Sequence, residues 1–388
     1  MNRKEFIDRY NDLTRFFLQG FAKGKKVENI AFSPFSILSM LSILADATAG
    51  SSRQEVLNLL YGDVKQQDFP EQLKTVREVL AKEKDYSSWL GYEDPYYGKP
   101  ILDMDKHLDT ANAVIVKQEH SDAIRPEFRK HLSDLYDGLL FSSLDLKETL
   151  KKWTSEATRE MLPLLENIID SESILAMINT VFFHAMWQYP YEGRDVRKGR
   201  FHNADHTDSK VMMLHGGSDC FVENEYAAGF IKEFQQCDYT FMALLPKEKG
   251  GEALQTTLET INFHDLMHSG KRAIVHTKMP EFSVSFRENM NNLMASLGIK
   301  EAFTPEADFS SVSTEPLFVD QMVHQAKIEV DRNGARAAAA TALILCGSCL
   351  PEDEKHVIIE RPFVFAILNR ELKIPAFVGV VNHIDSID

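Results

Sequence analysis

The pattern of apolar and polar residues divides the chain into a helical first part and a strand-rich later part. Near the N-terminus, apolar side chains recur every three or four positions, at Phe6, Tyr10, Leu13, Phe17 and Phe21. This spacing places them on one face of an amphipathic helix. Further helices are expected over residues 55–60, 69–84, 125–138, 150–165 and 289–297.

A strand is expected to lead directly into a buried helix at residues 29–38 (NIAFSPFSIL). Ser33 has the side chain of a helix N-cap, and Pro34 follows at the first helical position, where its missing N–H costs nothing. The residues that follow are nearly all apolar. A helix that is apolar on every side is expected to be buried.

Strands are predicted from two patterns. Residues 174–187 (ILAMINTVFFHAMW) form a near-continuous apolar run, which is typical of a strand buried on both faces. Residues 318–331 alternate instead, which is typical of a strand that covers a core on one side. Other strands are expected over residues 108–118, as several short ones within 209–246, within 273–286, and as a hairpin within 362–381.

Helices that come first and strands that come later indicate an α+β fold. No low-complexity linker and no internal repeat divides the 388 residues. We therefore expect one domain over residues 1–388.

Two polar residues interrupt the apolar patterns. Asn179 lies inside the run 174–187, and His324 lies on the apolar face of the run 318–331. Buried polar groups need hydrogen-bond partners. These two side chains are expected either to be satisfied structurally or to form part of a switch.

The segment 329–350 (EVDRNGARAAAATALILCGSCL) has almost no side-chain bulk in its middle. Its small residues are Gly334, Ala335, Ala337, Ala338, Ala339, Ala340 and Thr341. Alanine is the best helix former, which favours a short helix or a connector. The position between two strand-rich blocks favours an extended segment instead, and the residue types alone leave both open.

Composition limits the classes of partner. A formal net charge of -15 argues against general binding to nucleic acid or to anionic membranes, which both need clustered Lys and Arg. No run of 18 apolar residues predicts a transmembrane helix. Charged residues interrupt the N-terminal apolar positions, so we expect no secretory leader in the sequence as given. The compartment stays open between cytoplasmic and, for a processed form, extracellular.

The residues that usually carry enzymatic chemistry do not form a known motif. HExxH, GxxxxGK[ST] and a GxGxxG after a strand are all missing from the sequence. Cys346 and Cys349 form a C-x-x-C pair without a thioredoxin-like context, and Cys220 and Cys237 complete a set too small for a disulfide scaffold. A local disulfide or redox pair between Cys346 and Cys349 stays open. We expect no enzyme, no cofactor and no metal.

Several stretches together identify a family. They are residues 29–38, 179–187 (NTVFFHAMW), 323–342, 361–366 (RPFVFA) and 377–379 (FVG). In this order and spacing they resemble the serpins along essentially the whole chain. The resemblance implies three β-sheets with about nine helices, and an exposed reactive loop at about residues 332–356. It also implies that the native fold is metastable.

The resemblance gives the polar exceptions a role. Ser33, Ser36, Asn179 and His324 match the family's shutter residues, whose hydrogen bonds control opening of the central sheet. Trp187 matches the breach, where the loop first enters the sheet.

The resemblance also implies a mechanism for the Ala-rich segment. A target protease, serine or alternatively cysteine, attacks the loop as a substrate and forms an acyl-enzyme, and the cleaved loop then inserts into the central sheet. Inserted residues alternate inward and outward. Counted from the hinge glycine Gly334, the inward residues are small or apolar: Ala335, Ala337, Ala339, Thr341, Leu343 and Leu345. We therefore expect the loop to be able to insert.

The chain departs from the family pattern at a few positions. Family members usually carry Thr or Ser in place of Ala335 and Glu in place of Arg336, and neither change blocks insertion. Arg332 stands where Glu is common, and Glu281 stands where a Lys commonly pairs with that Glu. The exchanged signs predict an ion pair of reversed polarity. His383 replaces the usual Pro, which we regard as neutral.

Loop length in the family places the cleaved bond between Ser348 and Cys349. A small residue before the bond favours an elastase-like or subtilisin-like target. Cleavage after Leu345 or Leu350 would favour a chymotrypsin-like target instead. We expect a monomer that forms a covalent complex with its protease. The alternative is a non-inhibitory serpin with a chaperone, carrier or storage role.

Overall fold

The computed structural model describes residues 3–62, 69–81, 108–136, 138–145, 148–149, 152–153, 174–183, 185–235, 237–335 and 353–387. Two sets of predictions lie outside these ranges. One is the helix over 150–165, of which only Lys152 and Trp153 are described. The other is the segment after Ala335, with hinge residues Ala337, Ala338, Ala339, Ala340 and Thr341, the reactive bond Ser348–Cys349, and Cys346.

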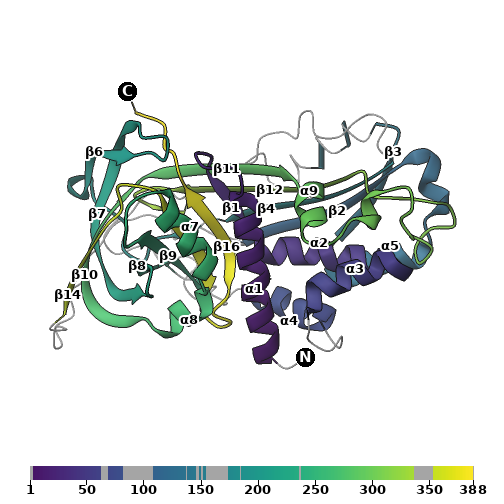
Figure 1. Ribbon diagram of the computed structural model, residues 1–388, viewed down its shortest axis with the longest axis horizontal. Coiled ribbons are helices and arrows are strands. Elements are labelled where there is room, and N and C mark those ends of the chain that lie inside the picture. Colours follow the sequence, from purple (N-terminus) through teal and green to yellow (C-terminus); the bar gives the residue numbers. More distant parts are fainter. Residues whose placement is uncertain are drawn as a thin grey trace, which may run out of the picture.

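The helices follow the expected order, with bounds that differ by a few residues (Figure 1). They are α1 (Arg3–Ala22), α2 (Pro34–Ala47), α3 (Gly50–Tyr61), α4 (Phe69–Ala81), α5 (Pro126–Tyr136), α7 (Gly251–Thr260), α8 (Phe263–His268) and α9 (Asn291–Ser296). The hydrophobic pattern did not predict α7 and α8. No described helix has the length and apolar character needed to span a membrane.

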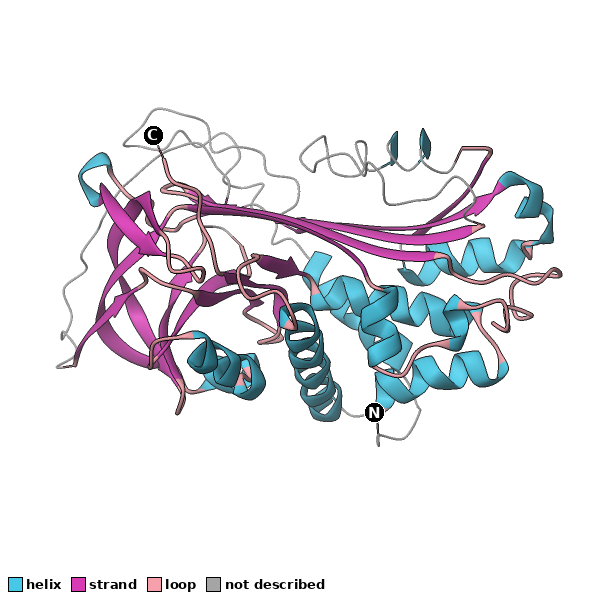
Figure 2. Ribbon diagram, turned by 45° about the horizontal axis from the view of Figure 1, so that its top comes forward, coloured by secondary structure: helices cyan, strands magenta, loops and turns pink. Residues whose placement is uncertain are grey.

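A seven-stranded sheet runs across the molecule above a layer of helices (Figure 2). Its strands in spatial order are β3 (Gly138–Ser143), β2 (Leu108–Lys117), β4 (Leu175–Phe183), β12 (Gln321–Val330), β13 (Gly334–Ala335) and β5 (Ala185–Met186), with β11 (Phe282–Asn289) paired to β12. The predicted run 174–187 thus forms two strands, β4 and β5. Every residue of β4 is buried, as its apolar sequence predicts.

The other described strands form a nine-stranded set at one end of the molecule (Figure 1). In spatial order they are β1 (Ile30–Phe32), β16 (Pro375–Val381), β15 (Phe363–Asn369), β9 (Tyr239–Pro246), β8 (Ala227–Glu233), β7 (Asp208–Glu223), β10 (Lys271–Pro280) and β14 (Glu354–Ile358), with β6 (Val196–His202) paired to β7. The α+β prediction is confirmed.

The strand β7 accounts for two differences from the prediction. We expected only short strands within residues 209–246, but β7 has 16 residues. Its first half pairs with β6 and its last residues pair with β8. Because one strand serves both groups, the described strands outside the seven-stranded sheet form one hydrogen-bonded set, where we expected two further sheets.

The strand β12 is buried more completely than its alternating sequence predicts. It begins at Gln321 instead of Phe318, and every side chain from Met322 to Ala326 is buried. The reason is a second apolar cluster on the other face of the sheet. Its buried members are Ala113, Ile115, Trp153, Ala176, Ile178 and Val323. The seven-stranded sheet is therefore covered on both faces at this point.

The helix α1 is held to the C-terminal hairpin by a buried hydrogen bond. The Tyr10 hydroxyl donates to the backbone oxygen of Pro375 at 2.8 Å. Tyr10 is fully buried and belongs to the main apolar core. The two ends of the sequence therefore share one core.

We expect Tyr10→Phe to lower the free energy of unfolding by about 1–3 kcal/mol, because the Pro375 carbonyl would lose its partner inside the core. The urea midpoint measures this change. Tyr226→Phe is the matched control, since Tyr226 is 38% exposed. Equal losses in the two variants would contradict the assignment.

Candidate functional site

The candidate site is the line along which the parallel strands β4 and β12 meet. They pair from Gln321↔Ala176 to Lys327↔Phe182. Beyond this point β13 lies between β12 and β5, with Val330 opposite Ala335 and Ala335 opposite Ala185. The first residues of the predicted hinge, Gly334 and Ala335, thus occupy a strand position at one end of the sheet.

Three of the four residues predicted to form the shutter meet in one line of hydrogen bonds that crosses from β12 to β4. His324 on β12 and Asn179 on β4 are direct neighbours in the register. The Nδ1 atom of His324 lies 2.9 Å from Oδ1 of Asn179. On the other side, the backbone N–H of Ser33 donates to Nε2 of His324 at 3.3 Å. The chain links the start of α2 to both strands.

The chain continues through a residue that the sequence analysis missed. Nδ2 of Asn179 donates to Oδ1 of Asn112 on β2 at 3.0 Å and to the backbone oxygen of Ala111 at 3.2 Å. Nδ2 of Asn112 donates in turn to the backbone oxygen of Tyr136, the last residue of α5. Asn112 is a buried polar residue in the apolar segment ANAVIV. The criterion that singled out Asn179 would have found it.

Ser36 takes a smaller part than expected. Its backbone N–H donates to the Ser33 hydroxyl at 3.3 Å, which caps α2 as predicted. Its own hydroxyl is buried and has no hydrogen-bond partner among the described residues. Ser36 therefore lies beside the line of hydrogen bonds, but its side chain takes no part in it.

The direction of these hydrogen bonds requires a neutral His324. Because the Ser33 N–H donates to Nε2, that nitrogen carries no proton, and Nδ1 donates to Asn179. Burial lowers the pKa of His324 from 6.5 to about 3, since the charged ring would lose its hydration. A second proton on the ring, at Nε2, would also point at the N–H of Ser33, which is itself a donor.

Trp187 fills the end of the sheet where β13 enters. It is fully buried, and its Nε1 donates to the backbone oxygen of Asp331 at 2.9 Å. Its ring stacks on Phe234 with centroids 4.7 Å apart. Its backbone N–H donates to the oxygen of Asn333. Trp187 therefore supports the turn that joins β12 to the hinge.

A buried lysine near Trp187 was missed as well. Nζ of Lys232 lies 4.7 Å from the ring centre of Tyr191 and 5.6 Å from that of Trp187. Burial lowers its pKa to about 8. Aromatic faces stabilise a cation in such a position. The sequence could have indicated it, because Lys232 follows the apolar residues of β8.

The turn before the hinge is fixed by charge and by hydrogen bonds. Oδ1 of Asp331 accepts from the backbone N–H groups of Asn333 at 2.7 Å and Gly334 at 3.1 Å. Nε of Arg332 lies 3.2 Å from Oε1 of Glu281, so the predicted ion pair of reversed polarity is confirmed.

Gly334 is needed for close backbone approach. A Cβ atom at this position would lie 2.1 Å from the Ala185 oxygen and 2.7 Å from the Met186 Cα. Both are backbone atoms of β5, so they cannot rotate away. Ala335 follows with no exposed surface. Ala335 belongs to the main apolar core.

Comparison with known proteins identifies the family. A family model described as "Serpin (serine protease inhibitor)" matches residues 8–384. The chain is a serpin. Among its relatives, the alpha-1-antiproteinase of Rattus norvegicus is 26% identical over 365 residues, which cover 91% of this chain and 83% of that protein. The alpha-1-antiproteinase 2 of Equus caballus is 25% identical over 363 residues, 91% of this chain and 81% of that protein.

Solved structures confirm the serpin fold. The native-state crystal structure of the thermophilic serpin tengpin matches with a TM-score of 0.82 and 25% identity, covering 99% of this chain and 95% of tengpin. A thyroxine-binding globulin in complex with thyroxine matches with a TM-score of 0.82 and 19% identity, covering 99% and 100% of the two chains. The proteins similar to this serpin thus include both antiproteinases and a thyroxine-binding protein.

We expect this serpin to lose stability as the pH falls from 6.5 toward 3. In this range the unfolded chain binds a proton at His324 that the folded chain does not, so the loss is on the order of 2 kcal/mol at pH 5. His324→Gln should be less stable at pH 7 but should lack this part of the pH dependence. Urea unfolding across the pH range measures both.

The control for this pH series is His206→Asn, which removes an exposed histidine from a turn. It should keep the wild-type slope below pH 6.5. Parallel stability curves for the wild type and His324→Gln would show that His324 does not carry the effect.

Gly334→Ala should displace β13 from its place beside β5, because the new Cβ meets backbone oxygen. A loss of about 1–3 kcal/mol is expected, in the range of other overpacked sites. Gly251→Ala is the control, since nothing lies within 4 Å of its Cβ position. Thermal unfolding compares the two, and a stable Gly334→Ala protein would contradict the clash.

Proposed function

We propose that this serpin inhibits a serine endopeptidase by inserting its cleaved loop into the seven-stranded sheet. The observation that carries the proposal is the position of β13. Gly334 and Ala335 are buried and paired between β12 and β5. The residues that follow are the small ones of the Ala-rich segment. Their entry would extend β13 along the line where β4 and β12 now meet.

Insertion would have to separate β4 from β12. These strands exchange backbone hydrogen bonds and are joined by the His324–Asn179 contact. A new strand replaces the backbone bonds on both sides, whereas the His324–Asn179 side-chain bond would be broken without such a replacement. The shutter role of Ser33, Asn179 and His324 is supported by this arrangement, with Asn112 as an added member.

The chemistry is that of an interrupted hydrolysis. The serine of the protease attacks the carbonyl carbon of Ser348 and gives up its hydroxyl proton. The bond to the nitrogen of Cys349 breaks, this nitrogen takes up the proton and leaves as an amine, and an ester to the protease remains. Insertion of the segment behind Ser348 then carries the ester-linked protease away from its first position. The small side chain of Ser348 suits an elastase-like or subtilisin-like enzyme. The inhibitor acts as a monomer that forms a covalent 1:1 complex.

The experiment mixes the full chain with an elastase-like protease and follows the products by SDS gel electrophoresis. We expect a covalent complex that resists SDS, and a large rise in melting temperature for the cleaved inhibitor. Mass spectrometry of the released C-terminal peptide identifies the bond. Clipped chain without any complex, for elastase-like and subtilisin-like enzymes alike, would contradict inhibition.

A matched pair of variants tests insertion itself. By the alternation that starts at the buried Ala335, position 337 turns inward and position 338 outward. Ala337→Arg would bury an unpaired charge and should yield cleaved chain instead of complex. Ala338→Arg should still form the complex. Equal behaviour of the two variants would contradict the insertion register.

A carrier role is the second candidate, because thyroxine-binding globulin shares the fold. At 19% identity this likeness concerns the fold alone. A carrier has no need for a loop that inserts, so charged or bulky inward hinge residues would favour it. The buried Ala335 favours inhibition. Complex formation with any protease separates the two candidates.

A further inference from the structure

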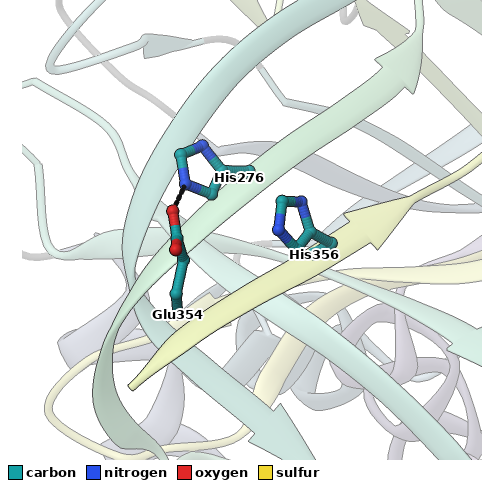
Figure 3. A group of neighbouring side chains, drawn as sticks. All are labelled: His276, Glu354 and His356. Atoms are coloured by element: carbon teal, nitrogen blue, oxygen red, sulfur yellow. Dashed lines mark hydrogen bonds and ion pairs between the residues drawn. The ribbon is translucent and has the colours of Figure 1, made fainter. Parts of the chain in front are cut away.

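Two histidines and a glutamate meet on an exposed face of β10 and β14, in a different sheet from the shutter residues (Figure 3). His276 belongs to β10, whereas Glu354 and His356 belong to β14. The parallel register sets His276 beside His356 and Ile274 beside Glu354. The three side chains therefore project from one face, two from alternate positions of one strand and one from its neighbour.

The nitrogen and oxygen atoms of these side chains are close enough to share one ion. One ligand atom from each residue lies within 4.8 Å of the other two. Nε2 of His276 is 2.5 Å from Oε1 of Glu354, and the two imidazole rings stack at 4.9 Å. Ligands around a tetrahedral zinc ion lie about 3.4 Å apart, given bonds of about 2.0–2.2 Å. Small rotations of these exposed side chains would bring the three ligand atoms from their present spacing to that of a zinc site.

Among the described residues of β7, β10 and β14, the neighbours of the cluster include a glycine and lysines that pair with carboxylates. The β7 residue opposite His276 is Gly217, which adds no side chain on this side. The nearest lysine along β10 is Lys278, and its Nζ is engaged with Glu360 at 3.2 Å. On β14, Lys355 pairs with Asp353 at 3.4 Å. These two lysines beside the cluster are thus paired with other carboxylates.

We propose that His276, Glu354 and His356 bind a divalent transition-metal ion of borderline softness, zinc above all. Imidazole nitrogen with one carboxylate is a ligand set that suits zinc, copper and nickel, whereas calcium and magnesium prefer oxygen ligands alone. Three protein ligands leave a fourth position for water. Within the described residues this is the one group of three that meets such a spacing.

The ion would fasten an edge strand. In the order of the nine-stranded set, β14 stands last and pairs with β10 alone among the described strands. It has only five residues, and parallel pairing is slightly less stable per residue than antiparallel pairing. An ion held by both strands would link them through their side chains. The segment just beyond the predicted reactive bond would thereby be held to the body of the protein.

The test titrates the full chain with zinc chloride in a calorimeter, after treatment with an alkylating agent so that thiolates do not compete for the ion. We expect one zinc per chain and no heat with magnesium chloride. His356→Asn and Glu354→Gln should each weaken zinc binding by about 100-fold or more, because each removes one of three ligands. Absence of zinc binding to the wild type would overturn the proposal.

His202→Asn is the matched control, because His202 pairs with a carboxylate but has no third ligand among the described residues. His202 lies 2.6 Å from Asp208 and is about as exposed as His276, at 53% against 50% of the side chain. This variant should bind zinc like the wild type. Equal weakening by His202→Asn and His356→Asn would overturn the site.

A second measurement reports on the strand itself. Zinc should slow hydrogen exchange at the backbone amides of β14 in the wild type and in His202→Asn, and should leave exchange unchanged in His356→Asn. Melting temperatures without zinc verify that each variant is folded. Zinc binding that leaves β14 exchange unchanged would overturn the link between the two strands.

Discussion

The contact on which the sheet depends is the hydrogen bond between His324 and Asn179. It joins two parallel strands that are direct neighbours, at a point where both faces of the sheet are covered. Through Ser33 on one side and Asn112 on the other, the same contact fixes the start of α2 and the end of α5. Each hydrogen bond along this line has a single direction of donation, so one misplaced proton disturbs the whole chain of bonds.

This arrangement explains why a polar chain can lie inside an apolar core. Replacing it with apolar side chains would bury more hydrocarbon, but it would also remove a directional contact that favours one register. The directional bonds favour one alignment of β4 and β12. They add a side-chain contact to the backbone hydrogen bonds that β4 and β12 exchange.

Local patterns predicted much of this fold. The apolar run around Asn179 and the Ser33–Pro34 start of α2 depend on periodicity and capping, which short segments encode. The bounds of β12 and the burial of Val323 depend on Trp153 and its neighbours, which are distant in the sequence. The meeting of His276 with Glu354 is also a tertiary event, because nothing near either residue indicates that β14 pairs with β10. Asn112 could have been predicted from the sequence, because it is a polar residue in an otherwise apolar strand.

The reversed ion pair between Arg332 and Glu281 has a consequence for how this chain can change. A substitution at only one of the two positions, to the charge that is usual in the family, would place two like charges about 3 Å apart. This would happen at the turn that leads into the predicted hinge. The pair is only partly exposed, at 41% and 23% of the side chains, so solvent would screen that repulsion incompletely. The two positions therefore constrain each other's evolution: a lineage can cross from one polarity to the other only through a neutral intermediate or by both substitutions at once.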